Sequence, residues 1–161
     1  MTVTYLHASK YGNGARVAQH FQDCLSKRGV QVSVHHISTM SPKNLPAADL
    51  YVFSSPGRMG KPIGSMRRFL ARLDLPVGSR YAILNTEMVT QPDKKTGRMP
   101  TEEEAARWRR MIPMMVAALD GKGLVGVGVD KVYVTDLKGP LEDGWEDKVE
   151  AFVSRLPVNV P

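Results

Sequence analysis

The chain has 161 residues, with 22 Lys and Arg against 16 Asp and Glu and a net charge of +6, and this length is typical of one domain with a full core. Its apolar runs fall short of the ~18 residues that span a bilayer, and it begins with no charged-then-apolar signal pattern, so we expect one cytoplasmic domain over residues 1–161. The single cysteine, Cys24, excludes an internal disulfide and a metal cluster held by several cysteines; we predict a small buried hydrophobe there and no metal site.

The positive charge is concentrated in the first half of the chain. Residues 1–80 contain eleven Lys and Arg against three Asp and Glu, a balance of +8, whereas residues 81–161 contain eleven against thirteen, a balance of −2. A basic half favours an anionic ligand, an anionic partner or an anionic membrane surface. No motif in the sequence indicates nucleic-acid binding.

The first half of the chain alternates predicted strands and helices. Short apolar or alternating runs predict strands over 3–8, 30–37 and 50–54. Apolar residues at helical spacing predict a helix over 13–28, ended by Gly29, and another over 63–73, with Pro62 in its first turn.

The second half continues the same alternation. We predict a strand over 81–84, a long polar loop over 89–100, and a helix that starts with a capping box of Thr101 and Glu104. Pro113 should kink or split this helix. A fifth strand lies within 121–137, where Asp130 and Lys131 could break it, and a last amphipathic helix follows over 145–156. The predicted buried stripe of the helix that contains Pro113 consists of Ala105, Trp108, Ile112, Met115 and Leu119. The repeated strand–helix units predict an α/β fold with a doubly wound parallel sheet.

Three polar segments, 9–14, 54–61 and 85–89, follow predicted strands one, three and four. The carboxyl ends of parallel strands share one edge of the sheet, which is where such folds bind ligands. The first segment supplies a hydroxyl, an amide, two glycines and a lysine directly before a helix, a pattern that suits a phosphate. Together the three segments predict a mononucleotide cofactor.

Two of these segments carry a family resemblance. Ala8-Ser9-Lys10-Tyr11-Gly12-Asn13-Gly14 and Ser54-Ser55-Pro56-Gly57-Arg58-Met59-Gly60, with the strand–helix units around them, resemble the flavodoxin family. The resemblance implies one flavodoxin-like domain with a five-stranded parallel sheet in the order 2-1-3-4-5. It also implies FMN at the switch between the first and third strands; order and position are known of that family, not worked out from this sequence. It further implies a protein that carries electrons between a redox partner protein and another partner or small-molecule acceptor.

The resemblance also implies a set of binding residues, with departures from the family pattern. The family's phosphate loop usually reads Ser/Thr-x-Thr-Gly-Asn-Thr, and Tyr11 and Gly14 replace two of its threonines. Flavodoxins usually stack an aromatic side chain on the flavin, but segments 54–61 and 85–89 contain no Trp, Tyr or Phe. Met59 and Met88 could pack there instead. The implied cofactor-binding residues are Ser9, Lys10, Tyr11, Gly12, Asn13, Gly14, Ser55, Pro56, Gly57, Arg58, Met59, Gly60, Asn85, Thr86 and Glu87.

The charge near the predicted flavin site is a further departure. Flavodoxin carriers are typically acidic there, which disfavours the anionic reduced ring. Here the charge is positive, and we predict that the reduced flavin forms more readily than in an acidic carrier. The cations concerned are Arg58, Lys61, Arg67, Arg68 and Arg72.

Two other functions remain open at this stage. Segment 88–95 and the basic balance are similar to the flavodoxin-like protoporphyrinogen oxidases, which are membrane-associated. That similarity implies an FMN-dependent oxidoreductase acting on a quinone, a porphyrinogen or NAD(P)H, peripheral to the inner face of the membrane, with Glu87 or Arg58 contacting substrate. A flavin-free regulatory domain is the weakest reading, because Ser54 and Ser55 stand where a phosphoacceptor domain needs an acidic residue.

We predict that the histidines of the strands, His7, His35 and His36, are structural. No acidic or cysteine partner stands at metal-ligand spacing from them.

Overall fold

Two strands with no exposed residue, β1 (Thr2–His7) and β3 (Leu50–Ser54), lie in the centre of the sheet in the computed structural model, which describes residues 1–158. Neighbouring strands are parallel and follow the order β2-β1-β3-β6-β7. The outer strands β2 (Gln31–His36) and β7 (Val125–Val134) mix exposed and buried positions, as expected at sheet edges. With β6 (Arg80–Met88) as fourth strand and β7 as fifth, the predicted doubly wound sheet in the order 2-1-3-4-5 is confirmed.

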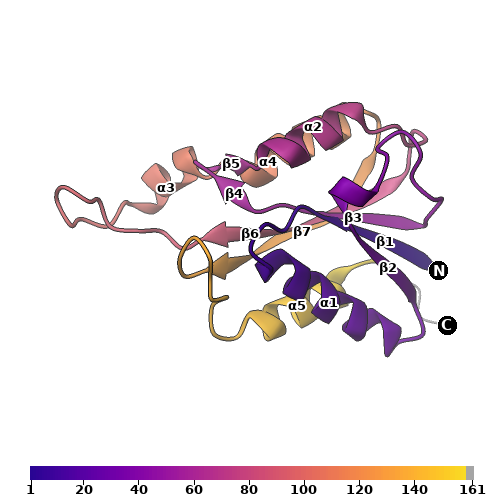
Figure 1. The fold of residues 1–161 in the computed structure, drawn as a ribbon, viewed down its shortest axis with the longest axis horizontal. Coiled ribbons are helices and arrows are strands. Elements are labelled where there is room, and N and C mark those ends of the chain that lie inside the picture. The colour runs from indigo at the N-terminus through magenta and orange to yellow at the C-terminus, as the bar shows by residue number, and fades with distance from the viewer. Residues whose placement is uncertain (159–161) are drawn as a thin grey trace.

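Helices cover both faces of this sheet (Figure 1). On one face α1 (Asn13–Ser26) and α5 (Trp145–Arg155) enclose one buried cluster, in which the rings of Phe21 and Phe152 lie 6.4 Å apart. On the other face α2 (Gly64–Arg72) and α4 (Met111–Asp120) enclose a second cluster around Phe53 and Met66. A short 3-10 helix, η1 (Ile37–Thr39), follows β2. None of the helices within residues 1–158 has the length and apolarity that crossing a membrane requires.

The structure corrects the predicted limits of two strands. β6 runs on to Met88, beyond the predicted end at 84, because β7 pairs with it as far as Met88 and Val134. Pairing with β7 thus keeps residues 85–88 extended, although their polarity alone indicates a loop. β7 is also continuous through Asp130 and Lys131, where the sequence left a break open.

A hairpin replaces part of the predicted loop 54–61. β4 (Gly57–Arg58) pairs antiparallel with β5 (Lys61–Pro62), and the turn between them places both Met59 and Gly60 at positive φ, 53° and 74°. Two positive φ angles are typical of the tight turns that join such strands. Pro62 therefore ends the hairpin and does not enter the first turn of α2 as predicted.

Residues 89–110, which we name the arm, project from the body of the molecule (Figure 1). The arm holds α3 (Glu102–Trp108), whose Thr101 side chain accepts a hydrogen bond from the Glu104 N–H, as the predicted capping box requires. The predicted split is confirmed: α3 ends at Trp108 and α4 begins at Met111, with Pro113 in its first turn. The predicted buried stripe is wrong at Trp108, which is 59% exposed, because α3 has left the core.

Candidate functional site

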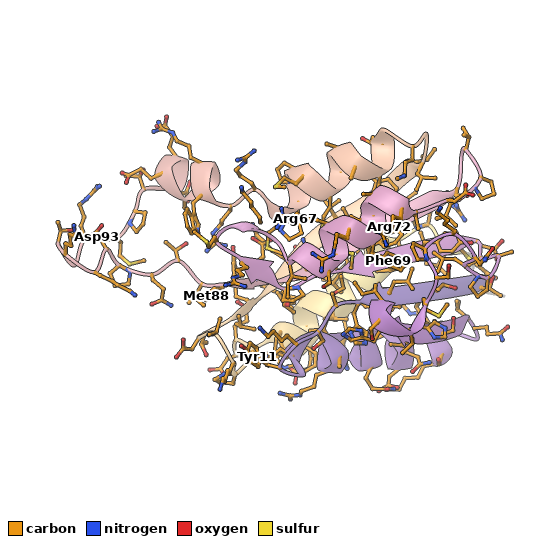
Figure 2. The ribbon with its side chains drawn as sticks, turned by 45° about the horizontal axis from the view of Figure 1, so that its top comes forward. Tyr11, Arg67, Phe69, Arg72, Met88 and Asp93 are labelled. Atoms are coloured by element: carbon orange, nitrogen blue, oxygen red, sulfur yellow. The ribbon has the colours of Figure 1, made fainter. Side chains whose placement is uncertain are left out.

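A cavity of about 260 Å³ opens at the carboxyl edge of the sheet. Its wall combines the turn before α1, the start of the β4–β5 hairpin, the end of β6 and the segment after β7. Tyr11 and Met88 lie at this end of the molecule, and Asp93 marks the far end of the arm beyond them (Figure 2). The lining residues are Ser9, Lys10, Tyr11, Asn13, Gly14, Pro56, Gly57, Arg58, Ile63, Thr86, Met88, Val134 and Leu137.

The turn before α1 presents an open helix N-terminus to this cavity. Gly12 precedes the helix in the left-handed region, at φ 93°, and no side chain caps the helix there. The first helical hydrogen bond runs from the Arg16 N–H to the Gly12 carbonyl at 3.0 Å, so the N–H groups of residues 13–15, in the first turn of α1, have no acceptor within the helix. The Gly12 N–H donates to Ser9 Oγ at 3.1 Å. Gly14 faces Ser9 so closely that a Cβ would stand 3.2 Å from the Ser9 Cβ. Such a turn can receive an anion on its backbone N–H groups.

Two histidines hold this turn in place. The Ser9 N–H donates to His7 Nδ1 at 3.2 Å, and His36 Nε2 lies 3.0 Å from the Ser9 carbonyl oxygen. The two rings meet edge to face with centroids 5.2 Å apart. Burial and, secondarily, the neighbouring His36 lower the pKa of His7 to about 4, so His7 is neutral near neutral pH and can accept the hydrogen bond. The predicted structural role of these residues is therefore the support of the loop at the cavity.

Ser55 and Asn85 connect the second polar segment to β6. The Ser55 N–H donates to Asn85 Oδ1 at 3.0 Å, and the Thr86 N–H donates to the Ser55 carbonyl at 3.2 Å. Pro56 and Thr86 form an isolated parallel bridge. Ser55 and Asn85 are both fully buried, so they fix the position of Pro56 and Thr86, which line the cavity.

The tip of the β4–β5 hairpin faces the arm. A Cβ on Gly60 would lie 1.9 Å from the Trp108 carbonyl oxygen, and the Arg110 N–H donates to the Gly60 carbonyl at 2.8 Å. Gly60 therefore allows the close approach of the arm to the hairpin. Met59, at the tip, is 73% exposed and does not line the cavity.

Glu87 is buried outside the cavity. Side chains alternate along β6, so Thr86 and Met88, which line the cavity, and Glu87 point to opposite faces of the sheet. Burial raises the pKa of Glu87, partly offset by Lys131 and Arg109, and Lys131 Nζ lies 4.0 Å from its Oε1.

The structure thus divides the predicted site residues into two groups. Nine line one cavity: Ser9, Lys10, Tyr11, Asn13, Gly14, Pro56, Gly57, Arg58 and Thr86. Six do not line it: Gly12, Ser55, Met59, Gly60, Asn85 and Glu87.

Sequence reasoning missed the contribution of the end of β7 and of the segment after it. Val134 and Leu137 line the cavity, and a Cβ on Gly139 would stand 2.8 Å from Asn13 Oδ1. A fifth parallel strand ends at the same edge as the others, which was the signal available. Tyr11 also provides an aromatic wall from the first loop, with Lys138 Nζ 5.7 Å from its ring centroid.

Five cations form a basic surface on the hairpin and α2, and we name this surface the α2 basic face. All five are exposed, and none of them forms an ion pair within residues 1–158. Arg67 and Arg72 mark its course along α2 (Figure 2). Its members are Arg58, Lys61, Arg67, Arg68 and Arg72.

Comparison with known proteins supports the fold. No protein-family model and no curated protein sequence matches the chain. Oxidised flavodoxin 2 from Bacillus cereus is similar in structure with a TM-score of 0.70 at 17% identity, over 96% of this chain and 97% of that one. A flavodoxin from Streptococcus pneumoniae gives a TM-score of 0.65 at 20% identity, over 97% of both chains.

A larger protein contains the same fold as one of its parts. The rubredoxin oxygen:oxidoreductase of Desulfovibrio gigas matches 96% of this chain but 35% of its own, with a TM-score of 0.66 at 9% identity. At these identities the likeness establishes the flavodoxin fold, and the predicted resemblance is confirmed at that level.

Proposed function

We propose that this chain binds FMN at the carboxyl edge of its sheet and carries electrons between redox partners. The observation that carries the proposal is the uncapped N-terminus of α1, which opens on a cavity with an apolar wall. Together these two features suit a ligand that has an anionic group at one end and a flat apolar body at the other. The flavodoxin fold supports the same cofactor.

The residues that line the cavity would hold the two ends of FMN differently. Ser9, Asn13 and the N–H groups of the first turn of α1 would hold the phosphate, because they supply donors where the helix dipole is positive. Tyr11, Met88 and Pro56 would border the ring. Bound FMN supplies the electron-accepting chemistry; the chain orients the ring and sets its electrostatic surroundings.

Positive charge near the ring would favour the reduced cofactor. Arg58 and Lys10 line the cavity, and further unpaired cations follow on the α2 basic face. A unit charge ~8 Å from the ring at an effective dielectric of ~20 contributes roughly 2 kcal/mol, equivalent to ~90 mV for one electron before screening by salt. We therefore expect a potential above that of an acidic flavodoxin.

The α2 basic face also indicates the charge of the partner. An exposed group of cations without acidic partners attracts an anionic surface and accelerates encounter with it. We propose an acidic redox protein as the partner and keep an anionic membrane surface as the second outcome. Co-sedimentation with vesicles that contain phosphatidylglycerol, against vesicles of phosphatidylcholine alone, separates the two.

Turnover distinguishes an electron carrier from an oxidoreductase. The purified protein should be yellow with about one flavin per chain. Once reduced, it should pass electrons to one-electron acceptor proteins and show no steady-state turnover of NAD(P)H with a quinone. Sustained turnover of those substrates by the isolated protein would favour the FMN-dependent oxidoreductase over the electron carrier. A colourless protein that takes up no FMN would exclude both functions.

A further inference from the structure

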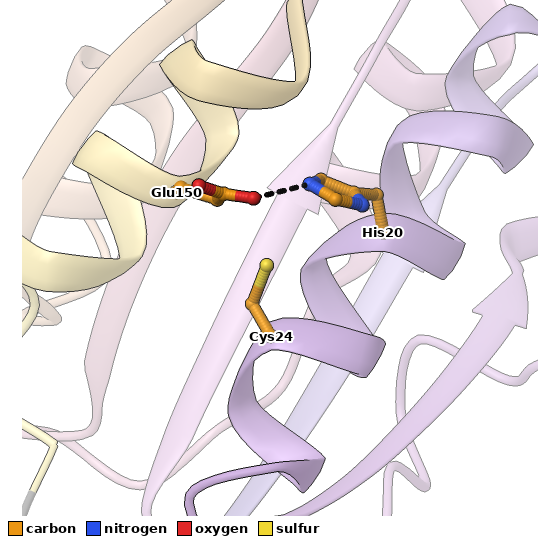
Figure 3. A group of neighbouring side chains, drawn as sticks. All are labelled: His20, Cys24 and Glu150. Carbon is orange, nitrogen blue, oxygen red and sulfur yellow. Dashed lines mark ion pairs between the residues drawn. The ribbon is translucent and has the colours of Figure 1, made fainter.

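A histidine, a cysteine and a glutamate come together between α1 and α5, away from the cavity (Figure 3). His20 and Cys24 are one helical turn apart on α1, and Glu150 reaches them from α5. Their potential ligand atoms all lie within 4.8 Å of one another. Two helices distant in the sequence thus place a nitrogen, a sulfur and an oxygen around one point.

The His20 ring is held so that its Nε2 faces the carboxylate. The ring packs edge-on against Trp145, with centroids 5.4 Å apart and an angle of 71°. His20 Nε2 lies 3.4 Å from Glu150 Oε1, which is longer than the 2.7–3.2 Å usual for an N–H···O hydrogen bond. Within residues 1–158 this buried nitrogen has no hydrogen-bond partner. A buried ring nitrogen without a partner is uncommon and calls for a ligand.

We propose that His20, Cys24 and Glu150 bind a Zn²⁺ ion, with water as the fourth ligand. Zinc lies ~2.0–2.1 Å from imidazole nitrogen, ~2.0–2.2 Å from carboxylate oxygen and ~2.3 Å from thiolate sulfur. Tetrahedral bonds of these lengths place the nitrogen and oxygen about 3.3–3.5 Å apart, and the two atoms are 3.4 Å apart here. The sulfur would lie about 3.5–3.7 Å from each of them, so within a cluster 4.8 Å wide the ion would draw the Cys24 side chain inward. A mixed N, S and O set suits zinc better than Mg²⁺ or Ca²⁺, which take oxygen ligands.

The charges around the cysteine are compatible with a divalent cation. Burial and then Glu150 raise the pKa of Cys24, so the group is a thiol in the free protein. Zinc binding would release that proton and form a thiolate. The Glu150 carboxylate and the thiolate would then balance the two positive charges. Asp23 adds to the negative field at the thiol, and Lys27 and Arg28 oppose it.

A cobalt titration of the metal-free protein reports metal binding and the thiolate ligand directly. Co²⁺ should bind with one saturable site per chain and give a thiolate-to-cobalt charge-transfer band in the near ultraviolet. Zn²⁺ should displace it and raise the melting temperature of the protein, because it binds only the folded arrangement of the two helices. Neither readout depends on flavin.

Single substitutions then test the geometry. Cys24→Ser should abolish the charge-transfer band, and His20→Gln and Glu150→Gln should each weaken Zn²⁺ binding by at least about tenfold, the lower end of what the loss of even an outer partner costs. Glu146→Gln, one turn earlier on α5, is the matched control and should bind Zn²⁺ like the wild type. The proposal is overturned if Zn²⁺ fails to saturate the wild type, or if Cys24→Ser and His20→Gln retain wild-type affinity.

Discussion

At the scale of single residues, buried polar groups that do not line the cavity hold its lining residues in place by hydrogen bonds. His7 accepts from the Ser9 N–H, and Asn85 accepts from the Ser55 N–H. Neither side chain lines the cavity, yet each fixes a residue or segment that does. A buried acceptor that loses its partner costs about 1–3 kcal/mol, so these hydrogen bonds restrict the loops strongly.

The buried, neutral His7 should make the fold less stable in acid. The pKa of His7 is lowered from 6.5 to about 4, so the unfolded chain binds more protons than the folded one between these values. The free energy of unfolding should therefore fall as the pH is lowered through 6.5 towards 4. Urea unfolding at a series of pH values should show a smaller decline for His7→Gln than for the wild type.

His35→Gln, on the adjacent strand β2, serves as the control for replacing a histidine by glutamine. An unchanged pH dependence in His7→Gln would show that other groups dominate acid unfolding.

Glu87 should destabilise the fold at neutral pH. Its pKa is raised above 4.5 by burial, so the folded chain binds more protons than the unfolded one, and its contribution to stability is lost as the pH rises through the folded value. Glu87→Gln should therefore raise the free energy of unfolding above that pH and match the wild type in acid. Denaturant titrations at both ends of the pH range measure the difference.

Glu102→Gln, at an exposed position of α3, serves as the control for the loss of one carboxylate. A uniform loss of stability in Glu87→Gln would mean that the contact with Lys131 outweighs the burial of the carboxylate.

At the scale of elements, the β4–β5 hairpin both borders the cavity and anchors the arm. Gly57 and Arg58 line the cavity, while Gly60 receives the Arg110 N–H and the Trp108 carbonyl lies against it. On the other side, Arg109 Nη2 donates to Thr90 Oγ1 at 2.6 Å and to the Met88 carbonyl at 3.1 Å. Both ends of the arm are thus connected to residues beside the cavity.

Gly60→Ala should detach the arm from the hairpin. The new Cβ would overlap the Trp108 carbonyl, in addition to the ~1–2 kcal/mol that a left-handed backbone costs any other residue. We expect a lower melting temperature and faster tryptic cleavage at Lys94 and Lys95. Gly78→Ala also introduces a side chain at positive φ, 88° against 74° at Gly60, but has open space around it, so it isolates the backbone cost. Equal effects of the two substitutions would contradict the close contact.

The order of elements follows from the sequence, but several local features do not. Apolar periodicity was sufficient for the alternation of strands and helices, and the capping box at Thr101 for the start of α3. The strand order was implied by the family resemblance. The continuation of β6 through Asn85 depends on pairing with β7, which local polarity does not reveal. The exposure of Trp108 depends on the arm leaving the core, and helical spacing carries no information about that.

The same limit applies to the two candidate sites. The three polar segments could be placed at one edge because parallel strands end together there. Which face each side chain takes depends on register, so Thr86 lines the cavity and Glu87 does not. The proposed zinc ligands were missed because Glu150 meets His20 and Cys24 only through the packing of α5 on α1.

At the scale of the whole molecule, the charge is distributed asymmetrically around the cavity. The α2 basic face has no acidic partner within residues 1–158, whereas the acidic residues of the second half lie on other elements. Such an asymmetry acts at long range on both an anionic partner and the potential of a bound ring.

Removing one positive charge at the cavity should lower the midpoint potential of bound FMN. Arg58→Gln should shift it negatively by on the order of tens of millivolts, and high salt should reduce the shift. Arg72→Gln removes the same charge at the far end of α2 and should have a smaller effect. Potentiometric titration measures both. Equal shifts would show that the position of the charge relative to the ring does not matter.

The central claim is that an anion docks at the N-terminus of α1, and FMN titration of the flavin-free protein tests it most directly. Flavin fluorescence should be quenched to saturation at about one FMN per chain. Gly12→Asp, which adds a carboxylate beside the docking site, should weaken binding by about tenfold or more. Gly78→Asp, with a similar φ but at the opposite edge of the sheet, should bind like the wild type. No saturable binding by the wild type, or equal affinity in the two variants, would contradict the account.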